Sequence, residues 1–350
     1  MVASYRSIEW RDGVLRMLDQ RRLPHELVYV DFTDCSEVGE AIRDMVIRGA
    51  PAIGVAAAYG LALAAQGSNS TDPGSVYSEV KEAADMLLTA RPTAVNLFWA
   101  IDRVLVSASA YAQESAASLC QSVLDEAHAI AAEDVETNMR IGLNALPLIP
   151  DKGTVIHHCN TGSLATMDYG TALGIIRTAH EHGKQLEVLV GETRPRLQGG
   201  QLTSWELKHL GVPLRVIVDG ASGHFMRTER VDLCLVGADR VAANGDIANK
   251  IGTYNLALAA WAHGVPFYVA APTTTFDMSL PTGDRIAIEE RPAREITHMG
   301  DYRILPDDVS VANPAFDITP AKYITAIITE RGIACPPCEA NLAALVRGDG

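Results

Sequence analysis

The sequence is poor in the features that mark secreted, membrane-spanning and nucleic-acid-binding proteins. Lys and Arg number 29 against 43 Asp and Glu, a formal net charge of −14. This balance argues against a nucleic-acid surface, because phosphate backbones are held by clustered basic side chains. No basic segment followed by an apolar run opens the chain, and no stretch approaches the roughly 20 uncharged apolar residues of a membrane span. We therefore expect a soluble, cytoplasmic protein that binds neither nucleic acid nor membrane.

The cysteines do not form the framework of a disulfide-rich domain. Six are scattered over 350 residues, and a chain of this length buries enough core to fold without cross-links. Cys335 and Cys338 form a lone CxxC pair without a second pair at zinc-site spacing, and its role stays open. The GxSxG, HExxH, GxxxxGK[ST] and strand-linked GxGxxG patterns are missing, which removes the usual sequence grounds for several large enzyme classes.

The first part of the chain predicts a mainly helical domain with short strands. Two domains are the default at this length, and we expect a helical domain over residues 1–125 followed by a catalytic domain over residues 126–350. Apolar spacing and Gly or Pro punctuation predict the elements of the first domain. They are a strand at residues 26–32, and helices at residues 36–45, 55–65, 76–90, 93–110 and 114–146.

From about residue 150 the pattern changes to a repetition of strand, turn and helix. The β-rich runs lie at residues 154–158, 186–190, 214–218, 233–236 and 267–270. Strands that alternate with helices predict a parallel, Rossmann-like sheet, so the fold class is α/β. In such sheets the ligand crevice lies beyond the carboxyl ends of the strands, where we expect the functional residues.

Cys159 stands at the carboxyl end of the first of these strands, in residues 157–166 (HHCNTGSLAT). The polar, Gly-containing turn predicts a helix N-terminus, whose free N–H groups favour an anion and lower the pKa of a nearby thiol. Cys159 is then a reactive thiol or, in the plainer alternative, a small buried apolar side chain. His157 and His158 point to opposite faces of the strand, which disfavours metal binding by the pair.

The exits of the second and third strands carry further polar side chains. Arg194, Arg196, Gln198 and Gln201 follow the second strand. Each of them could contact hydroxyl or phosphate groups, or could be a solvated loop residue. Residues 219–224 (DGASGH) follow the third strand and serve either as a helix entry or directly in the site.

The exit of the fourth strand carries Asp239, Asn249 and Lys250. An Asp directly after an apolar strand is placed for acid or base chemistry, because a partly dry cleft raises a carboxyl pKa. The alternative is a turn or helix-capping role. Asn249 and Lys250, just ahead of a predicted helix, offer a neutral donor and a cation to a phosphate.

Four of these segments together carry a family resemblance. They are residues 48–54 (RGAPAIG), 158–166 (HCNTGSLAT), 191–199 (GETRPRLQG), and 237–241 (GADRV) followed by 249–253 (NKIGT). The sequence resembles the methylthioribose-1-phosphate isomerases nearly from end to end. The resemblance implies an aldose-ketose isomerisation of 5-methylthio-α-D-ribose 1-phosphate to 5-methylthio-D-ribulose 1-phosphate in methionine salvage, without a metal or nucleotide cofactor.

The resemblance also assigns roles to individual residues. Asp239 is the proton donor and Cys159 the partner thiol. The substrate-binding residues that it implies are Arg48, Gly49, Ala50, Arg91, Gln198, Asn249 and Lys250. It implies a homodimer as well. The rival interpretations are a sister isomerase acting on ribose 1,5-bisphosphate or 5-deoxyribose 1-phosphate, and a non-enzymatic regulatory subunit of a translation initiation exchange factor from the same superfamily.

Overall fold

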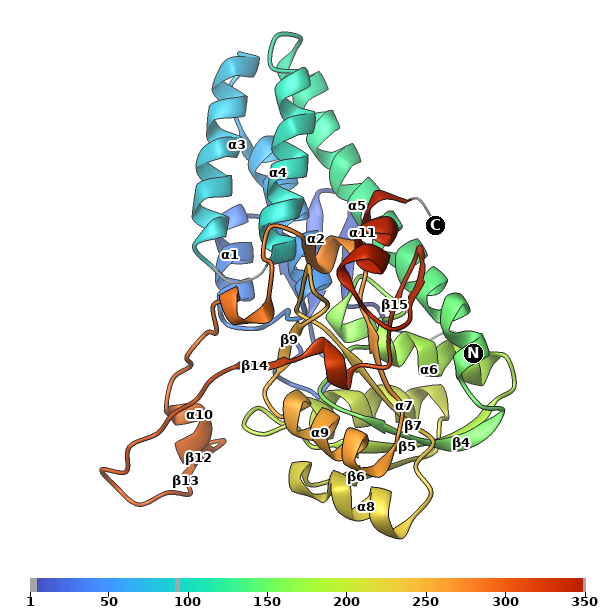
Figure 1. Cartoon of the computed structure of the whole chain (residues 1–350). Helices are drawn as coiled ribbons and strands as arrows, with labels where there is room; N and C mark the ends of the chain where they lie inside the picture. The colour runs from blue at the N-terminus through green and yellow to red at the C-terminus, as the bar shows by residue number, and fades with distance from the viewer. Residues whose placement is uncertain (1–4, 92–94, 349–350) are drawn as a thin grey trace. The chain divides into compact units, whose positions relative to one another are not determined.

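The computed structural model describes residues 5–91 and 95–348, and the chain divides into two compact units (Figure 1). Unit 1 comprises the chain up to Met139 together with Thr161–Gly170, and unit 2 comprises Arg140–Asn160 and Thr171–Gly350. This division does not coincide with the predicted boundary between residues 125 and 126. The physical reason is that one helix, α5 (Ala116–Ala145), runs without a break through that point.

Unit 1 combines a small antiparallel sheet, in the order β1-β2-β3, with a group of long helices. Its remaining elements are β1 (Ile8–Arg11), β2 (Val14–Leu18), β3 (Tyr29–Phe32), α1 (Cys35–Arg43), α2 (Ala50–Gly67), α3 (Pro73–Leu88) and α4 (Val95–Ala110). The predicted strand and helices of this part are all present. The first residues of the helix expected at 93–110 lie outside the described residues.

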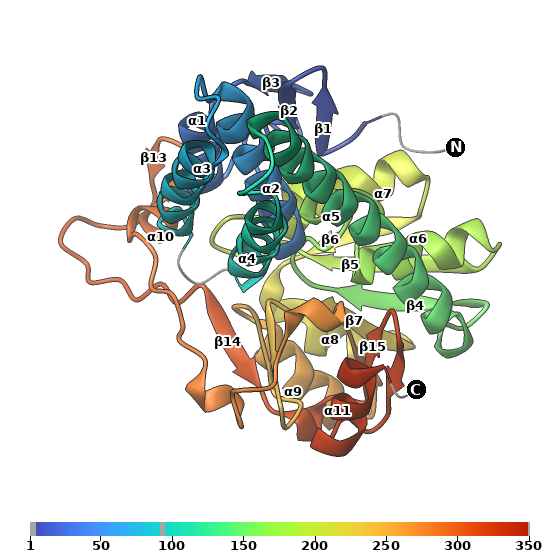
Figure 2. The same ribbon diagram turned by 90° about the horizontal axis from the view of Figure 1, so that it is seen from above.

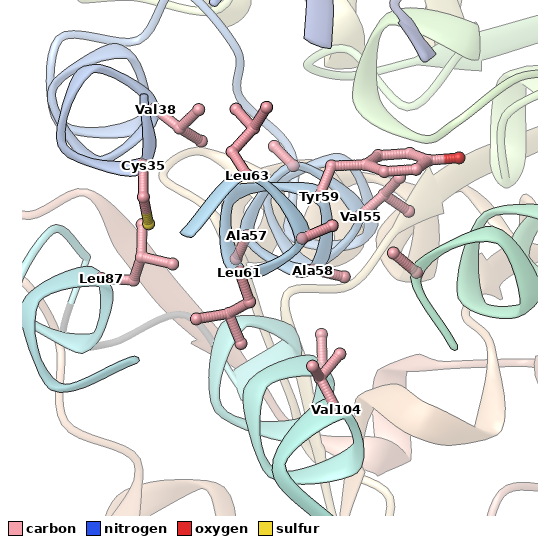
Figure 3. Close-up of a cluster of buried hydrophobic side chains, with 14 of the residues drawn as sticks. Cys35, Val38, Val55, Ala57, Ala58, Tyr59, Leu61, Leu63, Leu87 and Val104 are labelled. Atoms are coloured by element: carbon pink, nitrogen blue, oxygen red, sulfur yellow. The ribbon is translucent and has the colours of Figure 1, made fainter. Parts of the chain in front are cut away.

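Helix α2 forms the centre of unit 1, with α1, α3 and α4 around it (Figure 2). Its small residues allow neighbouring helices to approach on several sides, and a Cβ on Gly54 would lie only 2.8 Å from the backbone oxygen of Asn96. Figure 3 shows Leu61 and Tyr59 of α2 pointing to different neighbours within this core, which Leu87 and Val104 join from α3 and α4.

The composition of α2 also corrects the expectation that no stretch approaches a membrane span. Its 18 residues are long and apolar enough to cross a membrane by length and composition alone, but 72% of them are buried inside the protein. A helix that packs on all sides must be apolar all round, so the same composition serves a core helix.

Unit 2 is built on a seven-stranded sheet in the order β16-β15-β10-β7-β4-β5-β6, in which only the pairing of β15 with β16 is antiparallel. Its strands are β4 (Lys152–His157), β5 (Gln185–Gly191), β6 (Leu214–Ile217), β7 (Leu233–Gly237), β10 (Phe267–Ala270), β15 (Ala326–Thr329) and β16 (Gly332–Ala334). The five strands predicted from the sequence are confirmed, and so is the α/β fold class.

Alternate residues of these strands enter two different cores. Ile156, Leu189 and Cys234 belong to one apolar cluster, whereas their neighbours Val155 and Val188 belong to another. Helices cover both faces of the sheet, as the repetition of strand and helix predicts. They are α6 (Ala172–Glu181), α7 (Ser204–Leu210), α8 (Ser222–Thr228), α9 (Thr253–His263) and α11 (Glu339–Arg347).

The segment between β7 and α9 forms strands of its own rather than a simple loop. β8 (Arg240–Ala242) and β9 (Ile247–Lys250) make an antiparallel hairpin within a second sheet, in the order β11-β8-β9-β14. The other strands of that sheet are β11 (Phe276–Asp277) and β14 (Phe316–Thr319). A further excursion carries α10 (Arg294–Thr297), β12 (His298–Met299) and β13 (Tyr302–Arg303), and projects from the rest of unit 2 (Figure 1).

Candidate active site

The order of the main sheet reverses between β4 and β7. From β4 the chain builds outward through β5 and β6, and from β7 it builds in the other direction through β10 and β15. β4 and β7 are hydrogen-bonded neighbours, and His157 of β4 pairs with Leu235 of β7. Ligands of open α/β sheets bind at such a switch point, beyond the carboxyl ends of the strands.

Cys159 and Asp239 follow the carboxyl ends of these two neighbouring strands. Cys159 comes two residues after His157, the last residue of β4, and Asp239 comes two residues after Gly237, the last residue of β7. The thiol residue is 8% exposed, and Asp239 is half-buried. The structure therefore places both sequence-predicted catalytic residues at the topological switch point.

The prediction of a helix N-terminus beside Cys159 is wrong. The residues after Asn160 enter unit 1, where residues 161–170 contain only the three-residue 3₁₀ turn Ser163–Ala165, and the next α-helix begins at Ala172. A Gly-containing polar turn after a strand is typical of a helix entry, whereas here it begins a long excursion. The following helix therefore gives no reason for a lowered thiol pKa.

The backbone of Cys159 is held on both sides by threonine hydroxyls. Its N–H donates to Oγ1 of Thr193 at 2.9 Å, and its carbonyl accepts from Oγ1 of Thr203 at 2.7 Å. The φ angles of Cys159 and Thr193 are 67° and 66°. Residues with a side chain rarely adopt this left-handed conformation, which persists where the surroundings enforce it and is concentrated at functional sites.

Two buried histidines precede the cysteine. His157 donates from Nδ1 to the carbonyl of Leu235 at 2.8 Å, and burial lowers its pKa to about 4. His158 donates from Nε2 to the carbonyl of Ile251 at 2.9 Å. Burial lowers its pKa as well, although the carboxylate of Asp219 acts in the opposite direction. Burial therefore favours the neutral form of both imidazoles, and their hydrogen bonds hold β4 against its neighbours.

Asn249 and Lys250, the last residues of β9, are tied to both strand exits. The residue before them, Ala248, accepts the N–H of Asp239 at 2.9 Å. The residue after them, Ile251, accepts from His158, the neighbour of Cys159. These two bonds bring the predicted acid, the thiol and the predicted phosphate-binding pair into one region of unit 2.

Asn249 and Lys250 are themselves buried, at 4% and 8% exposure. Lys250 donates from Nζ to the carbonyl of Ala315 at 2.8 Å, and its ammonium lies 4.4 Å from the ring centre of Phe316. Asn249 donates to Oγ1 of Thr253 at 2.9 Å. These contacts hold both side chains in place at the end of β9.

Gln198 lies at the exit of β5, next to the anchor of Cys159. A Cβ on the following residue, Gly199, would lie 1.8 Å from the carbonyl of Gly191 and 2.9 Å from Oγ1 of Thr193. This close approach admits only glycine. Gln198 is 8% exposed, and its Oε1 has no hydrogen-bond partner within the part of the chain that the structure describes. Buried amide oxygens are normally paired, so this acceptor is available to a ligand.

The two arginines of the same exit bind the projecting excursion instead. Arg196 forms an ion pair with Glu295 at 2.9 Å. Arg194 donates to the carbonyl of Ile296 at 3.2 Å and to the sulfur of Met299 at 3.5 Å. The sequence alone allows either a ligand contact or a solvated position, and in the structure both arginines hold the segment that carries α10 and β12.

The remaining predicted binding residues belong to unit 1. Arg48 and Gly49 precede α2, which begins at Ala50, and Arg91 follows α3. Gly49 has a φ of 97°, and a Cβ there would lie 2.4 Å from the carbonyl of Ala165, so glycine is required. This contact joins the α2 loop to the segment that continues from Cys159. The binding roles of all four residues stay predictions.

Comparison with known proteins agrees with this arrangement. Residues 46–336 match the model of the Initiation factor 2 subunit family. Methylthioribose-1-phosphate isomerase of Synechococcus sp. is 57% identical over 336 residues, 96% of each chain. The chain belongs to the methylthioribose-1-phosphate isomerases of this family. Their solved structure from Pyrococcus horikoshii is 42% identical, with a TM-score of 0.92 over 99% of both chains.

One further solved structure carries a different description. The chain described as translation initiation factor eIF-2B subunit delta from A. fulgidus is 44% identical, with a TM-score of 0.88 over 98% of this chain and 100% of that one. Two kinds of description thus accompany the same fold at similar identity. The fold alone therefore does not decide the activity, which has to be argued from the residues of the site.

Several residues that shape the site are not among those that the sequence predicts for it. Thr193 and Thr203 hold Cys159, and Glu206 accepts from the Asn160 amide at 2.7 Å. Asp317 of β14 accepts the N–H groups of Gly252 and Tyr254 at the start of α9. Burial raises the pKa of Asp317 to about 6. Asp317 is an acid inside an apolar strand, and Thr193 lies in the segment 191–199 that carries the family resemblance, but neither signal indicates the hydrogen bonds that these residues make.

Among residues 5–91 and 95–348, no group of three or more His, Cys, Asp or Glu side chains is arranged to hold a metal ion.

Proposed function

We propose that this chain converts 5-methylthio-α-D-ribose 1-phosphate into 5-methylthio-D-ribulose 1-phosphate, with Asp239 as the proton donor and Cys159 as its partner. The observation that carries the proposal is the position of these two residues at the carboxyl ends of neighbouring strands, where the order of the sheet reverses. Asn249 and Lys250 lie in the chain between Ala248, which bonds to Asp239, and Ile251, which bonds to the neighbour of Cys159. Relatives more than 50% identical bear the name of this isomerase.

The substrate explains why an acid is needed first. Its anomeric oxygen is esterified to phosphate, so the furanose ring does not open spontaneously as a free sugar does. In the proposed reaction Asp239 gives a proton to the ring oxygen while the bond from that oxygen to C1 breaks. The half-buried position of Asp239 suits this step, because a site that excludes water strengthens such interactions.

Hydrogen then moves from C2 to C1, and two routes balance. In the first, C2 transfers a hydride to the electron-poor C1, and the C2 hydroxyl loses its proton to become the ketone. In the second, the Cys159 thiolate removes the C2 proton to form a phosphoenolate, C1 is protonated afterwards, and the C2 hydroxyl loses its proton to become the ketone. Turnover in deuterium oxide separates them, because only the second route allows deuterium from solvent to enter at C1.

The remaining predicted residues complete the proposal. Gln198 offers its buried Oε1 to a sugar hydroxyl, and Lys250 and Asn249 bind near the reacting carbons. Arg48, Gly49, Ala50 and Arg91 bind substrate as well, the first three through the start of α2. We further propose a cytoplasmic homodimer. Sedimentation of a monomer at micromolar concentration would contradict the dimer.

A comparison of three sugar phosphates tests the substrate. We expect the highest kcat/KM on 5-methylthioribose 1-phosphate, above 5-deoxyribose 1-phosphate and ribose 1,5-bisphosphate. A preference for ribose 1,5-bisphosphate of more than about tenfold, roughly 1.4 kcal/mol in transition-state binding, would overturn the assignment.

The second candidate function is a regulatory part of a translation initiation exchange factor, which the A. fulgidus structure favours by its description. The presence of both Cys159 and Asp239 argues for the isomerase. A folded, pure protein with no turnover on any of the three sugar phosphates would favour the regulatory function instead.

A further inference from the structure

Asp219 connects three strand exits of unit 2. It follows β6 after Val218, and its carboxylate accepts the N–H of Thr193 at 2.8 Å and the N–H of Arg194 at 2.7 Å. On another side, Oδ1 lies 3.8 Å from Nδ1 of His158. One side chain thus reaches residues that follow β4 and β5 as well as its own strand.

The two hydrogen bonds hold a backbone that is otherwise unfavourable. Thr193 is β-branched and has a φ of 66°, a conformation that such residues avoid because Cβ then crowds the backbone. Two consecutive N–H groups aimed at one carboxylate are charge-assisted hydrogen bonds, the stronger kind. Asp219 is therefore the group that stabilises the left-handed conformation at Thr193.

Thr193 passes this constraint to Cys159. Its Oγ1 accepts the N–H of Cys159 at 2.9 Å and donates to the carbonyl of Gly191 at 3.0 Å. The hydroxyl thus ties the exit of β4 to the exit of β5. If the backbone at Thr193 relaxed, this hydroxyl would move away from Cys159, which has a left-handed backbone of its own.

A partnership with His158 is the simpler role for Asp219, and the geometry disfavours it. Nε2 of His158 carries the proton that is donated to Ile251. A neutral His158 therefore presents a lone pair at Nδ1, which gives the carboxylate no proton to accept. The distance of 3.8 Å is also longer than a hydrogen bond. The bonds that Asp219 makes are those to the β5 exit.

We propose that Asp219 is a positioning residue for Cys159. It fixes Thr193, whose hydroxyl fixes the backbone of Cys159 and with it the direction of the thiol. The kinetic part of this inference rests on the proposed function, whereas the effect on the thiol itself does not.

The test compares Asp219→Ala with Asp232→Ala. Asp232 is a matched control, because its carboxylate accepts a backbone N–H, that of Thr154 at 2.9 Å, at the opposite end of the strand that leads to Cys159. The readouts are kcat, KM, the melting temperature, and the alkylation rate of Cys159 by iodoacetamide. That rate is measured peptide by peptide, with the exposed Cys335 as an internal reference.

We expect Asp219→Ala to change the alkylation rate of Cys159 about fivefold or more relative to Cys335. We also expect kcat to fall by about 10- to 100-fold with KM altered less than about threefold, because a small misplacement of a reacting group costs rate more than binding. Asp219→Asn keeps one acceptor and should give a smaller change in the same direction. Asp232→Ala should leave the kcat and the Cys159 alkylation rate within about twofold of the wild type.

Thr193 provides the second arm of the test. Thr193→Val replaces the hydroxyl with a methyl group and should reproduce the change in the Cys159 alkylation rate. Thr193→Ser keeps the hydroxyl and should leave that rate near the wild-type value. Combining Thr193→Val with Asp219→Ala should add little, because the two residues act in series. Normal Cys159 alkylation in Thr193→Val, or an Asp219→Ala protein that melts earlier with unchanged alkylation and kcat, would overturn the inference. If the wild type turned over no sugar phosphate, the proposed function would fail, and the alkylation rates would still decide the positioning role.

Discussion

The two ends of the seven-stranded sheet are both hollowed, but they are built differently. At the amino ends of β4 and β5 lies a hollow of about 840 Å³, lined by exposed or half-buried residues such as Lys152, Lys184 and Arg230. At the carboxyl ends lies a hollow of about 290 Å³ that reaches His157, His158 and Asp219. Volume alone would select the amino end.

Burial and backbone conformation indicate that the carboxyl end of the sheet is the functional edge. His157, Asn249 and Lys250 are all less than 9% exposed there, and polar groups are buried only where something compensates the cost. Cys159 and Thr193 have left-handed backbones at the same end. The comparison teaches that a functional edge is recognised by costly features that the fold maintains, rather than by the size of a hollow.

The strongest test of a functional carboxyl edge is substitution of the two predicted reacting groups, Cys159 and Asp239. We expect Cys159→Ser and Asp239→Asn each to lower kcat by about 10³-fold or more, since a positioned acid or base contributes rate of that order. The melting temperature should stay within a few degrees of the wild type, because both changes are nearly isosteric. Steady-state kinetics beside thermal unfolding measures this, and near-normal turnover in either variant would remove that residue from the mechanism.

Much of this edge could be predicted from the sequence. Apolar runs bounded by polar, Gly-containing segments gave the five strands and placed Cys159 and Asp239 at strand ends. Such patterns are local, because the burial of a strand is reflected in the hydrophobicity of its own consecutive residues. The parallel direction of the strands then brings their carboxyl ends to one edge without further information.

The return of residues 161–170 to unit 1 could not be predicted, because it depends on residues far away in the chain. Ser163 is held by the hydroxyls of Tyr5 and Ser7, and Leu164 accepts from the side chain of Gln20 at 2.6 Å. These partners lie more than 140 positions apart in sequence. The left-handed Thr193 was hidden for the same reason, since Asp219, 26 positions away, maintains it.

The buried imidazole of His157 predicts a pH dependence of stability at this edge. Its pKa is about 4 in the folded protein against 6.5 ordinarily. The unfolded chain therefore binds the proton more readily, and the stabilisation is fully present above pH 6.5 and lost as the pH falls toward 4. The shift corresponds to a loss of about 3 kcal/mol in the free energy of unfolding.

His157→Asn removes this titration and keeps a side-chain donor. We expect the variant to lose less stability than the wild type between pH 7 and pH 4.5, measured by urea unfolding at both pH values. Other buried groups titrate in both proteins, so their contributions cancel in the difference. The exposed His180 provides the control through His180→Asn. Equal pH dependence of the wild type and His157→Asn would show that the buried imidazole is not the cause.

Gln198 tests whether the carboxyl edge binds the substrate, as distinct from whether it carries out the chemical step. Gln198→Leu keeps the volume and removes the buried Oε1 that lacks a protein partner. If this oxygen accepts from a sugar hydroxyl, KM should rise about tenfold with a smaller change in kcat. Stability should be unchanged or slightly higher, because an unpaired buried polar atom is removed. An unchanged KM would exclude Gln198 from the substrate contacts.

Substitution in the amino-end hollow should have the smallest effect on activity, and a large effect there would contradict the assignment of the site to the carboxyl edge. Its cations could attract a phosphate, and Lys184 is the most buried of the three, with its side chain 17% exposed. That lysine already has partners, however. Its Nζ donates to the carbonyl of Ile149 at 2.7 Å and lies 3.0 Å from the carboxylate of Asp151.

We therefore expect Lys184→Met to act on stability alone. Removing one hydrogen bond and a largely exposed ion pair should cost about 0.5–1.5 kcal/mol in the free energy of unfolding. The kcat/KM should stay within about twofold of the wild type, because the residue lies at the end of the sheet where the strands begin. Urea unfolding and steady-state kinetics on the same preparation measure both. A fall in kcat/KM of more than about fivefold, about 1 kcal/mol in transition-state binding, would place substrate contacts at the amino end and reverse the comparison between the two edges.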